Sequence, residues 1–285
     1  MSLIDFILNV AGILLCLNWR SISSDPFARG VPATLSGTVS RAQPMRVKRW
    51  HYLAALIGLL LARTIFYWQV GPAVNWTPKL DLYLVVLTFR GAFFLPSLFF
   101  SLLSFLQAFL VFYFWLLTLA ALNRSASGSD PIQKMISLQL GRLARWWWFA
   151  QIITPFFAVA ALWIIFHPAM VYTGVTGRTQ SNLHLVEQSL LAGAAIVLSL
   201  KYFLPAFLAV HLVTSYVYLG KSPLLDFVGL TARNILAPLN RLSLRAGKID
   251  LAPIIGIILI LLLLHALPNF ALAYLSRYNL TVWPQ

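Results

Sequence analysis

The sequence predicts an all-α fold, a polytopic transmembrane helical bundle of about six spans with two amphipathic surface helices on the cytoplasmic side. Three observations lead to this prediction. Of the 285 residues, 60% are hydrophobic and only 10% are charged, whereas soluble domains carry about 25% charged residues. Apolar runs recur at about 20 residues, the length at which a helix crosses a bilayer. The 21 Lys and Arg against 7 Asp and Glu give a formal charge of +14, which we interpret as a positive-inside signal and not as a nucleic-acid surface.

Six apolar segments define the predicted spans. They are residues 3–18, 51–70, 92–122, 149–169, 185–219 and 251–275. The first only just reaches across the hydrocarbon core, and neither a preceding basic stretch nor a small-residue cleavage site accompanies it. We therefore expect a retained transmembrane helix there, with an interfacial or re-entrant helix as the alternative. Residues 80–90 are predicted to form an interfacial helix.

The distribution of basic residues predicts the orientation of the spans. The segments 19–50, 123–148 and 220–250 hold 6, 4 and 5 Lys or Arg, 15 in total, and the opposite side holds 4. Because cytoplasmic loops are enriched in Lys and Arg, these three loops are predicted to face the cytoplasm and both termini to face away. The run Trp146-Trp147-Trp148 falls at the inner boundary, where aromatic belts occur; a quinone or haem platform is the alternative.

A repeated order of elements indicates an internal duplication. Pro155 and Pro253 are each followed by eleven largely apolar residues and then by His167 and His265. Each of these spans follows a basic, proline-containing loop that itself follows a long apolar span, so one unit occurs twice. The predicted organisation is an appended N-terminal membrane segment at 1–91 (two spans plus the interfacial helix), a first repeat at 92–170 and a second repeat at 185–275.

Both repeated loops carry the pattern of an amphipathic helix. Apolar residues recur at helical spacing at Ile132, Ile136, Leu140 and Leu143, and again at Leu224, Val228, Ile235, Leu239 and Leu242. The basic residues predicted to contact anionic lipid or a partner protein are Arg142, Arg145, Arg233, Arg241 and Arg245. Basic amphipathic helices between spans lie in the membrane interface. Docking of the apolar stripe onto the protein's own bundle is the alternative that periodicity leaves open.

The second loop ends in a recognisable motif. Ser222-Pro223 opens its helix, and Gly247-Lys248-Ile249-Asp250-Leu251-Ala252-Pro253 leads into the final span. This stretch resembles the YggT family, whose members read Gly-Gly-[Ile/Leu]-Asp-[Leu/Phe]-Ser-Pro at this place, with Lys248 and Ala252 as the departures. The first repeat matches loosely, retaining Asp130-Pro131. The resemblance implies a non-enzymatic membrane protein, linked in bacteria to osmotic or envelope stress and cell division and in plastid relatives to assembly of a membrane cytochrome.

The motif residues Pro223, Gly247, Asp250 and Pro253 also have plain structural interpretations. Asp250 is placed to act as the N-cap of the final span, where a carboxylate favours the positive end of the helix dipole. Pro253 fits the first helical turn, where a missing N–H costs nothing. Gly247 permits the preceding turn. The motif is therefore consistent with a folding signature that carries no chemistry.

Two basic residues lie inside predicted spans, and intramembrane charges are functional candidates by default. For Arg63 we expect snorkelling toward the outer interface or pairing, with Asp5 or Glu187 as partners. Lys201 lies nearer the middle of a long span, four residues before Pro205. Because no acid is predicted at its depth, its head group is expected to use backbone carbonyls freed by the proline, water or a neutral state.

The sequence contains no motif for enzyme chemistry. There is no P-loop, no glycine-rich dinucleotide turn, no His-Glu-x-x-His and no pair of carboxylates, and the single Cys16 excludes a disulfide framework. We therefore expect no enzyme, no cofactor and no metal site. The intramembrane histidines leave haem as an alternative, with His167 and His265 as the pair whose depths match, although hydrogen-bonded interfacial histidines are the preferred interpretation.

These observations lead to a functional expectation. The preferred one is a non-catalytic membrane scaffold or assembly or stress-related factor in the bacterial inner membrane, which binds anionic lipid and other integral membrane proteins. It binds no nucleic acid, and homo-oligomers are compatible with it. The alternative is a small transporter or channel for ions or osmolytes that uses Lys201 at mid-membrane, since duplicated repeats are common among transporters.

Overall fold

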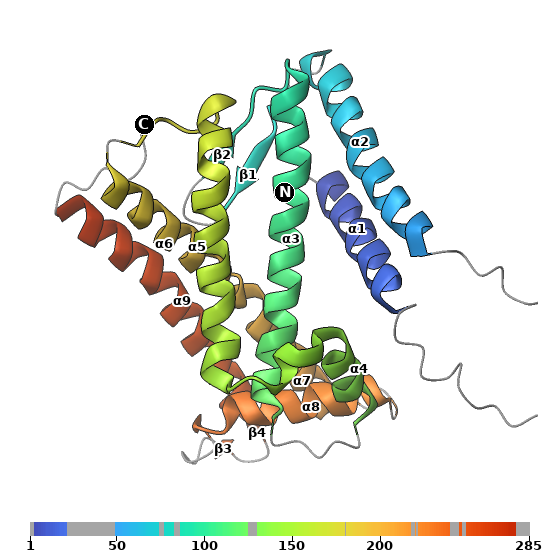
Figure 1. Cartoon of the computed structure of the whole chain (residues 1–285). Coiled ribbons are helices and arrows are strands. Elements are labelled where there is room, and N and C mark those ends of the chain that lie inside the picture. The colour runs from blue at the N-terminus through green and yellow to red at the C-terminus, as the bar shows by residue number, and fades with distance from the viewer. Residues whose placement is uncertain are drawn as a thin grey trace, which may run out of the picture. The chain divides into compact units, whose positions relative to one another are not determined.

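The structure is a computed structural model of the chain, and helices form nearly all of its regular elements (Figure 1). It describes residues 3–21, 49–73, 77–82, 86–124, 130–179, 181–217, 220, 222–239, 245–246 and 249–277. Within these residues, 6 helical segments are long and apolar enough to cross a membrane. The prediction of an all-α, multi-pass membrane protein is therefore confirmed.

The predicted spans correspond to long helices whose ends lie within a few residues of the expected positions. These helices are α1 (Leu3–Ser21), α2 (Arg49–Ala73), α3 (Phe94–Leu122), α5 (Trp148–Tyr172), α6 (Asn182–Leu198), α7 (Leu200–Tyr216) and α9 (Ala252–Arg277). Because long apolar runs have few places at which a helix can end, polar and turn-forming residues fix these boundaries closely.

The fifth predicted span is not one continuous helix. α6 and α7 are separated at Ser199, whose hydroxyl donates back to the carbonyl of Ile196 at 2.6 Å. The indole Nε1 of Trp115 donates to the same hydroxyl oxygen at 3.1 Å. Pro205 lies inside α7, six residues after the break.

The interfacial helix predicted at residues 80–90 is wrong. The chain forms two short strands there, β1 (Lys79–Asp81) and β2 (Val86–Thr88), paired in a two-stranded sheet. Exposed and buried residues alternate along both strands, with Leu80 and Leu87 inward. This period of two, together with β-branched residues in β2, favours strands over a helix.

The two loops predicted to carry amphipathic helices do so. The first forms α4 (Pro131–Leu140) and the 3-10 helix η4 (Gly141–Arg145), and the second forms α8 (Pro223–Leu236). Both helices start in the same way: Asp130 accepts a hydrogen bond from the amide of Ile132 at 2.9 Å, and Ser222 accepts one from the amide of Leu225 at 3.2 Å. A side-chain cap followed by proline at the first helical position is a strong helix start. After α8, β3 (Arg245–Ala246) pairs with β4 (Ile249–Asp250).

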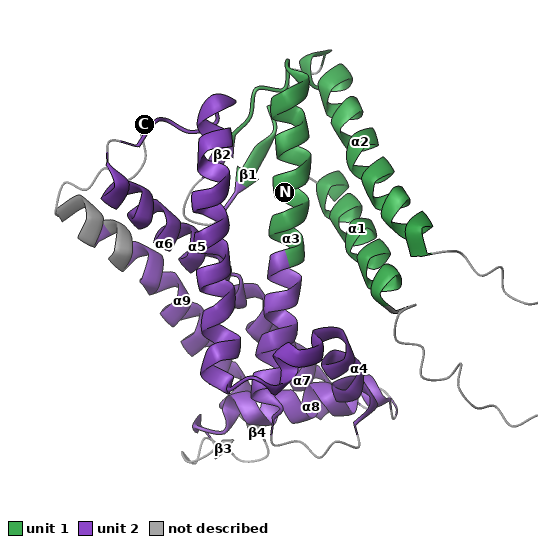
Figure 2. Ribbon diagram, viewed as in Figure 1, with its two compact units in different colours: residues 1–80, 88–109 green, residues 81–87, 110–285 purple. Residues whose placement is uncertain are grey.

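The molecule divides into two compact units, coloured separately in Figure 2. Unit 1 contains residues 1–80 and 88–109, and unit 2 contains residues 81–87 and 110–285. In unit 1, α1 packs against α2. The α1 helix also comes close to α3 at Gly12, where an added Cβ would lie 2.7 Å from the ring of Phe105. Small residues at such crossings allow transmembrane helices to pack closely.

In unit 2, α5 packs against α6 and α7 packs against α9, while α4 and α8 lie together across one end (Figure 2). One apolar cluster joins α3, α4 and α8 and consists of Leu117, Leu119, Ala120, Ile136, Leu140 and Phe227. A second cluster joins α7, α8 and α9 around Leu208, Ala232 and Leu236. The surface helices are therefore part of the core of unit 2.

The contact between α5 and α6 generates a prediction about stability. A Cβ added at Gly193 would lie 2.7 Å from the backbone oxygen of Phe156, and a backbone atom cannot move aside as a flexible side chain does. Gly193→Ala should therefore lower the free energy of unfolding by about 1–3 kcal/mol, the usual size of an overpacking penalty. The measurement is thermal or denaturant unfolding in mild detergent.

Gly58→Ala is the matched control. An added Cβ there meets nothing within 4 Å, and alanine is the better helix former, so this change should be neutral or stabilising by up to about 1 kcal/mol. Equal stability of the two variants would contradict the close packing of α5 on α6.

Candidate functional site

The apolar stripes of both surface helices pack against the protein's own bundle. Ile136 and Leu140 of α4 are buried with Phe227 of α8 and with the end of α3. In α8, Ala232 and Leu236 are buried against α7 and α9. Both helices therefore dock onto the protein's own bundle, which was the alternative that periodicity left open. Other helices already cover most of each apolar stripe.

A buried polar network also fastens α8 to the end of α3. The side-chain amide of Asn123 donates to the hydroxyl of Thr231 at 2.8 Å, and Asn234 donates to the side-chain oxygen of Asn123 at 2.9 Å. Asn234 also donates to the carbonyl of Leu122 at 3.1 Å, and Thr231 donates to the carbonyl of Phe227 at 2.8 Å. Asn123 and Thr231 are fully buried. This network holds the surface layer in a fixed place, since a buried polar group without its partner is costly.

The outer face of the α4–η4–α8 layer combines basic and apolar side chains. The three described basic residues of the predicted contact set, Arg142, Arg145 and Arg233, are all exposed. The exposed apolar residues of the same layer and of the turn after it include Met135, Leu138, Leu224, Trp146, Trp147, Trp148 and Phe149. Amphipathic aromatic rings beside arginines suit the head-group region of a bilayer. We call this face the basic–aromatic surface.

The YggT-like motif is only partly described. Arg241 and Gly247 lie outside the described residues, and for Arg245 and Asp250 only the backbone is described. Pro223 occupies the first position of α8, and Pro253 lies in the first turn of α9, as predicted. The N-cap assignment of Asp250 is wrong, because its backbone belongs to β4 opposite Arg245.

A hydrogen bond identifies the residue that starts α9 instead. The amide of Ile255 donates to the carbonyl of Leu251 at 3.0 Å, so the helix begins directly after Leu251. The sequence interpretation placed the cap one residue too early, because it did not foresee that β3 and β4 pair and draw Asp250 into the strand.

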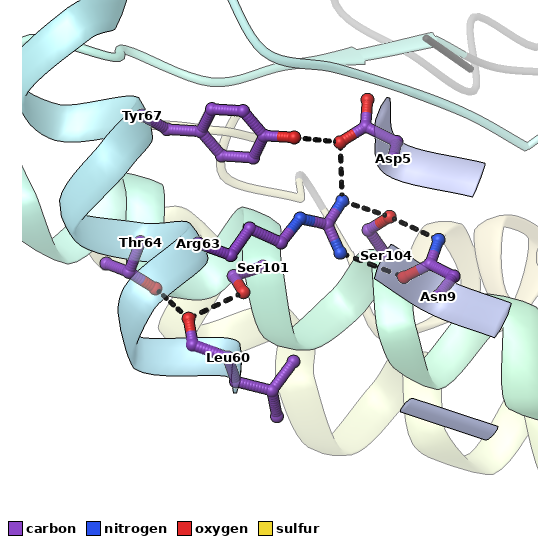
Figure 3. Close-up of polar contacts among 8 residues, drawn as sticks. All are labelled: Asp5, Asn9, Leu60, Arg63, Thr64, Tyr67, Ser101 and Ser104. Carbon is purple, nitrogen blue, oxygen red and sulfur yellow. Dashed lines mark hydrogen bonds and ion pairs between the residues drawn. The ribbon is translucent and has the colours of Figure 1, made fainter. Parts of the chain in front are cut away.

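Unit 1 contains a buried charged cluster centred on Arg63 (Figure 3). One guanidinium nitrogen donates to Asp5 Oδ1 at 2.7 Å and to Ser104 Oγ at 2.9 Å. The other terminal nitrogen donates to Asn9 Oδ1 at 2.8 Å, and Asn9 donates to Ser104 at 3.1 Å. The hydroxyl of Tyr67 donates to the same Asp5 oxygen. Arg63 is 3% exposed, which excludes snorkelling and confirms Asp5 as its partner.

The cluster is arranged to neutralise its charges. Asp5 and Arg63 cancel in net charge, and the guanidinium also lies 5.5 Å from the ring centre of Tyr67 and 5.2 Å from that of Phe100. Unpaired charge in hydrocarbon costs several kcal/mol, whereas a paired and hydrogen-bonded group is tolerated. This arrangement can hold three helices together, and we assign it a structural role.

Asn9, Tyr67 and Ser104 were not predicted as partners of Arg63, although the periodicity of polar residues could have identified them. Asp5, Asn9 and Gly12 lie on one face of α1, spaced four and three residues apart, and all are buried. α3 has the corresponding pattern in Ser97, Ser101 and Ser104, and Ser101 donates to the carbonyl of Leu60 at 3.1 Å. A stripe of polar and small residues in an apolar span marks its contact with other helices.

Two further predicted residues are placed as follows. Lys201 is half-buried at the start of α7, directly after the break, and its Nζ lies 4.9 Å from the ring centre of Tyr202. Glu187, the second suggested partner of Arg63, lies 3.4 Å from Nδ1 of His184 on its own helix. In the described part of the chain, no group of three or more His, Cys, Asp or Glu could hold a metal ion.

No protein-family model, no curated protein and no solved structure matches this chain.

The Arg63 cluster predicts strong coupling between two residues that are far apart in sequence. Arg63→Met alone leaves a buried carboxylate, and Asp5→Leu alone leaves a buried guanidinium, so each should destabilise by about 3–5 kcal/mol. The double variant removes both charges, so its free energy of unfolding should fall by much less than the sum of the two single decreases. The measurement is a double-mutant cycle of unfolding in mild detergent.

Arg178→Met is the control, because Arg178 is exposed and its removal should change stability by less than about 0.5 kcal/mol. Additive effects of the two buried substitutions would contradict the ion pair.

Proposed function

We propose that this protein is a non-catalytic membrane scaffold or assembly factor of the kind that the YggT resemblance implies. In this proposal the basic–aromatic surface binds anionic lipid and partner membrane proteins. The protein lies in the bacterial inner membrane, and its three basic loops face the cytoplasm, where anionic lipid and the positive-inside rule both favour Lys and Arg.

The observation that carries the proposal is the difference between the inner and outer faces of the surface layer. The inner faces of α4 and α8 are buried and hydrogen-bonded to the bundle, so the layer is held rigidly. Its outer face nevertheless keeps Met135, Leu138 and Leu224 largely exposed, at 63%, 59% and 60%. Large apolar residues that remain exposed on a rigid, basic surface indicate an interaction surface for lipid or protein.

The lipid part of the proposal predicts a loss of affinity when charge is removed. Arg142→Gln together with Arg145→Gln should weaken association with anionic lipid by about 1 kcal/mol per charge, roughly fivefold for each. The measurement is the preference of the reconstituted protein for spin-labelled phosphatidylglycerol over phosphatidylcholine, at low and high salt. High salt should reduce the difference, because exposed charges are screened.

The control for this experiment is Arg90→Gln together with Arg178→Gln. Both residues are exposed and lie outside the surface layer, so the same number of charges is removed elsewhere. A loss of lipid preference in the control as large as in the test variant would show that net charge matters and the basic–aromatic surface does not.

A second candidate function, a small transporter or channel, is favoured by one observation. The candidate span Asn182–Tyr216 is interrupted at Ser199, two residues before the intramembrane charge Lys201. Discontinuous helices beside charged residues are a feature of transporter sites. Against it, the hydroxyl of Ser199 donates to Ile196 and accepts from Trp115, so the break is closed by internal hydrogen bonds.

Lys201→Met separates the two candidates. For a scaffold, the fold and the co-purifying partner set should persist, and neither wild type nor variant should conduct ions or osmolytes in proteoliposomes. We expect this result. Robust wild-type flux that disappears in the variant, with the fold intact, would establish transport and refute the scaffold.

A further inference from the structure

A cavity of about 500 Å³ lies where the C-terminal end of α7 meets α8. Sites for small molecules in proteins usually measure about 300–1,000 Å³. The residues that line this cavity are His211, Thr214, Ser215, Gly220, Leu225, Asp226, Gly229, Leu230 and Arg233. It belongs entirely to unit 2 and forms no part of the Arg63 cluster.

The described lining of the cavity contains one carboxylate and one guanidinium. Asp226 and Arg233 are seven residues apart on α8, about 10 Å along its axis, and both side chains are exposed and line the cavity. Among the described residues, no ion pair joins Asp226 to Arg233. Asp226 and Arg233 can thus bind the two ends of a zwitterion.

The hydroxyl groups of the cavity add acceptors on the side of α7. Thr214 donates its hydroxyl hydrogen to the carbonyl of His211 at 2.9 Å, and Ser215 donates to the carbonyl of Leu212 at 2.7 Å. Both hydroxyl oxygens can therefore only accept hydrogen bonds from a ligand, through their lone pairs. Together with the carboxylate of Asp226 they suit a group with several N–H donors.

The residues that line the cavity favour a primary ammonium over a quaternary ammonium. A primary ammonium has three N–H donors for these acceptors, whereas a quaternary ammonium has none and is usually bound by aromatic rings. Among the described residues that line this cavity there is no Phe, Tyr or Trp, and His211 contributes the one aromatic ring. At the other end, the planar guanidinium of Arg233 matches the oxygens of a phosphodiester.

The apolar surface beside the cavity indicates that the ligand is a lipid. Val210, Val213, Tyr216 and Val217 of the same part of α7 are exposed, and α7 belongs to a segment long and apolar enough to span the membrane. A head group in the cavity would thus leave its acyl chains along an apolar helix.

We propose that this cavity binds a phospholipid whose head group joins a phosphodiester to a primary ammonium, that is, a phosphatidylethanolamine. The phosphate lies at Arg233, and the ammonium lies among Asp226 and the hydroxyl oxygens of Thr214 and Ser215. This deepens the lipid-binding part of the proposed function by naming a lipid class, and of the basic–aromatic surface it uses Arg233 but neither Arg142 nor Arg145.

The test is native mass spectrometry of the full chain in mild detergent, titrated with phosphatidylethanolamine, phosphatidylcholine and phosphatidylglycerol of identical acyl chains. Wild type should bind phosphatidylethanolamine at least about tenfold more tightly than phosphatidylcholine. Asp226→Asn should remove most of this preference, because a charge-assisted hydrogen bond is worth about a factor of ten or more. Arg233→Gln should weaken binding of both lipids.

Two variants of one glycine test the place of binding. An added Cβ at Gly229 would meet only His211 Nδ1, at 3.9 Å, so Gly229→Ala should fold as wild type does. Gly229→Leu should fill the cavity and abolish the preference, and its thermal unfolding should match that of Gly229→Ala. A preference that survives Gly229→Leu would overturn the proposal.

Three further results would overturn the inference. They are equal affinity of wild type for the choline and ethanolamine lipids, an ethanolamine preference unchanged in Asp226→Asn, and water-soluble glycerophosphoethanolamine competing at the same concentration as the lipid. The last result would assign the cavity to a free metabolite. The Arg142 and Arg145 experiment is independent, so failure here and failure of the proposed function are distinguishable.

Discussion

The structure depends on one constraint: a polar side chain buried inside an apolar bundle is costly unless it finds a partner within the protein. Arg63 shows the constraint in its strongest form, because its guanidinium is buried and hydrogen-bonded to Asp5, Asn9 and Ser104. The α1 helix carries an acid and an amide that would otherwise oppose its insertion. Their pairing with Arg63 explains how such a helix can be stable next to α2, and unit 1 is best understood as a neutralised ion pair enclosed by three helices.

The same constraint operates in unit 2 without net charge. Asn123 closes the end of α3, and its amide and carbonyl are both used by α8 through Thr231 and Asn234. The α8 helix is thus fixed by directional bonds as well as by apolar packing, and directional bonds determine its register. A surface helix held in this way presents a constant outer face, which a binding surface requires for specificity.

How much could be predicted from the sequence varies with the physical signal. Long apolar runs located the spanning helices, and proline after a capping residue located α4 and α8, because both signals are local. The Asp5 partner of Arg63 could be named because so few acids exist. Asn9, Tyr67 and Ser104 were missed because neutral polar residues are common in spans. The β1–β2 hairpin was missed because its strands are only three residues long, too short for alternation to stand out.

The surface layer shows why function was harder to predict than fold. The amphipathic stripes of α4 and α8 were the most visible feature of the loops, and the structure uses them for docking on the bundle. In the proposed function, binding therefore depends on the residues of the layer that remain exposed, most of which lie outside the apolar stripes. Asp226 illustrates this: on a basic helix it looks like an exception, yet it lines a cavity together with Arg233. In the proposed lipid site, a carboxylate and a guanidinium on the same helix select a zwitterion over a simple anion, and this selectivity follows from three-dimensional placement, not from net charge.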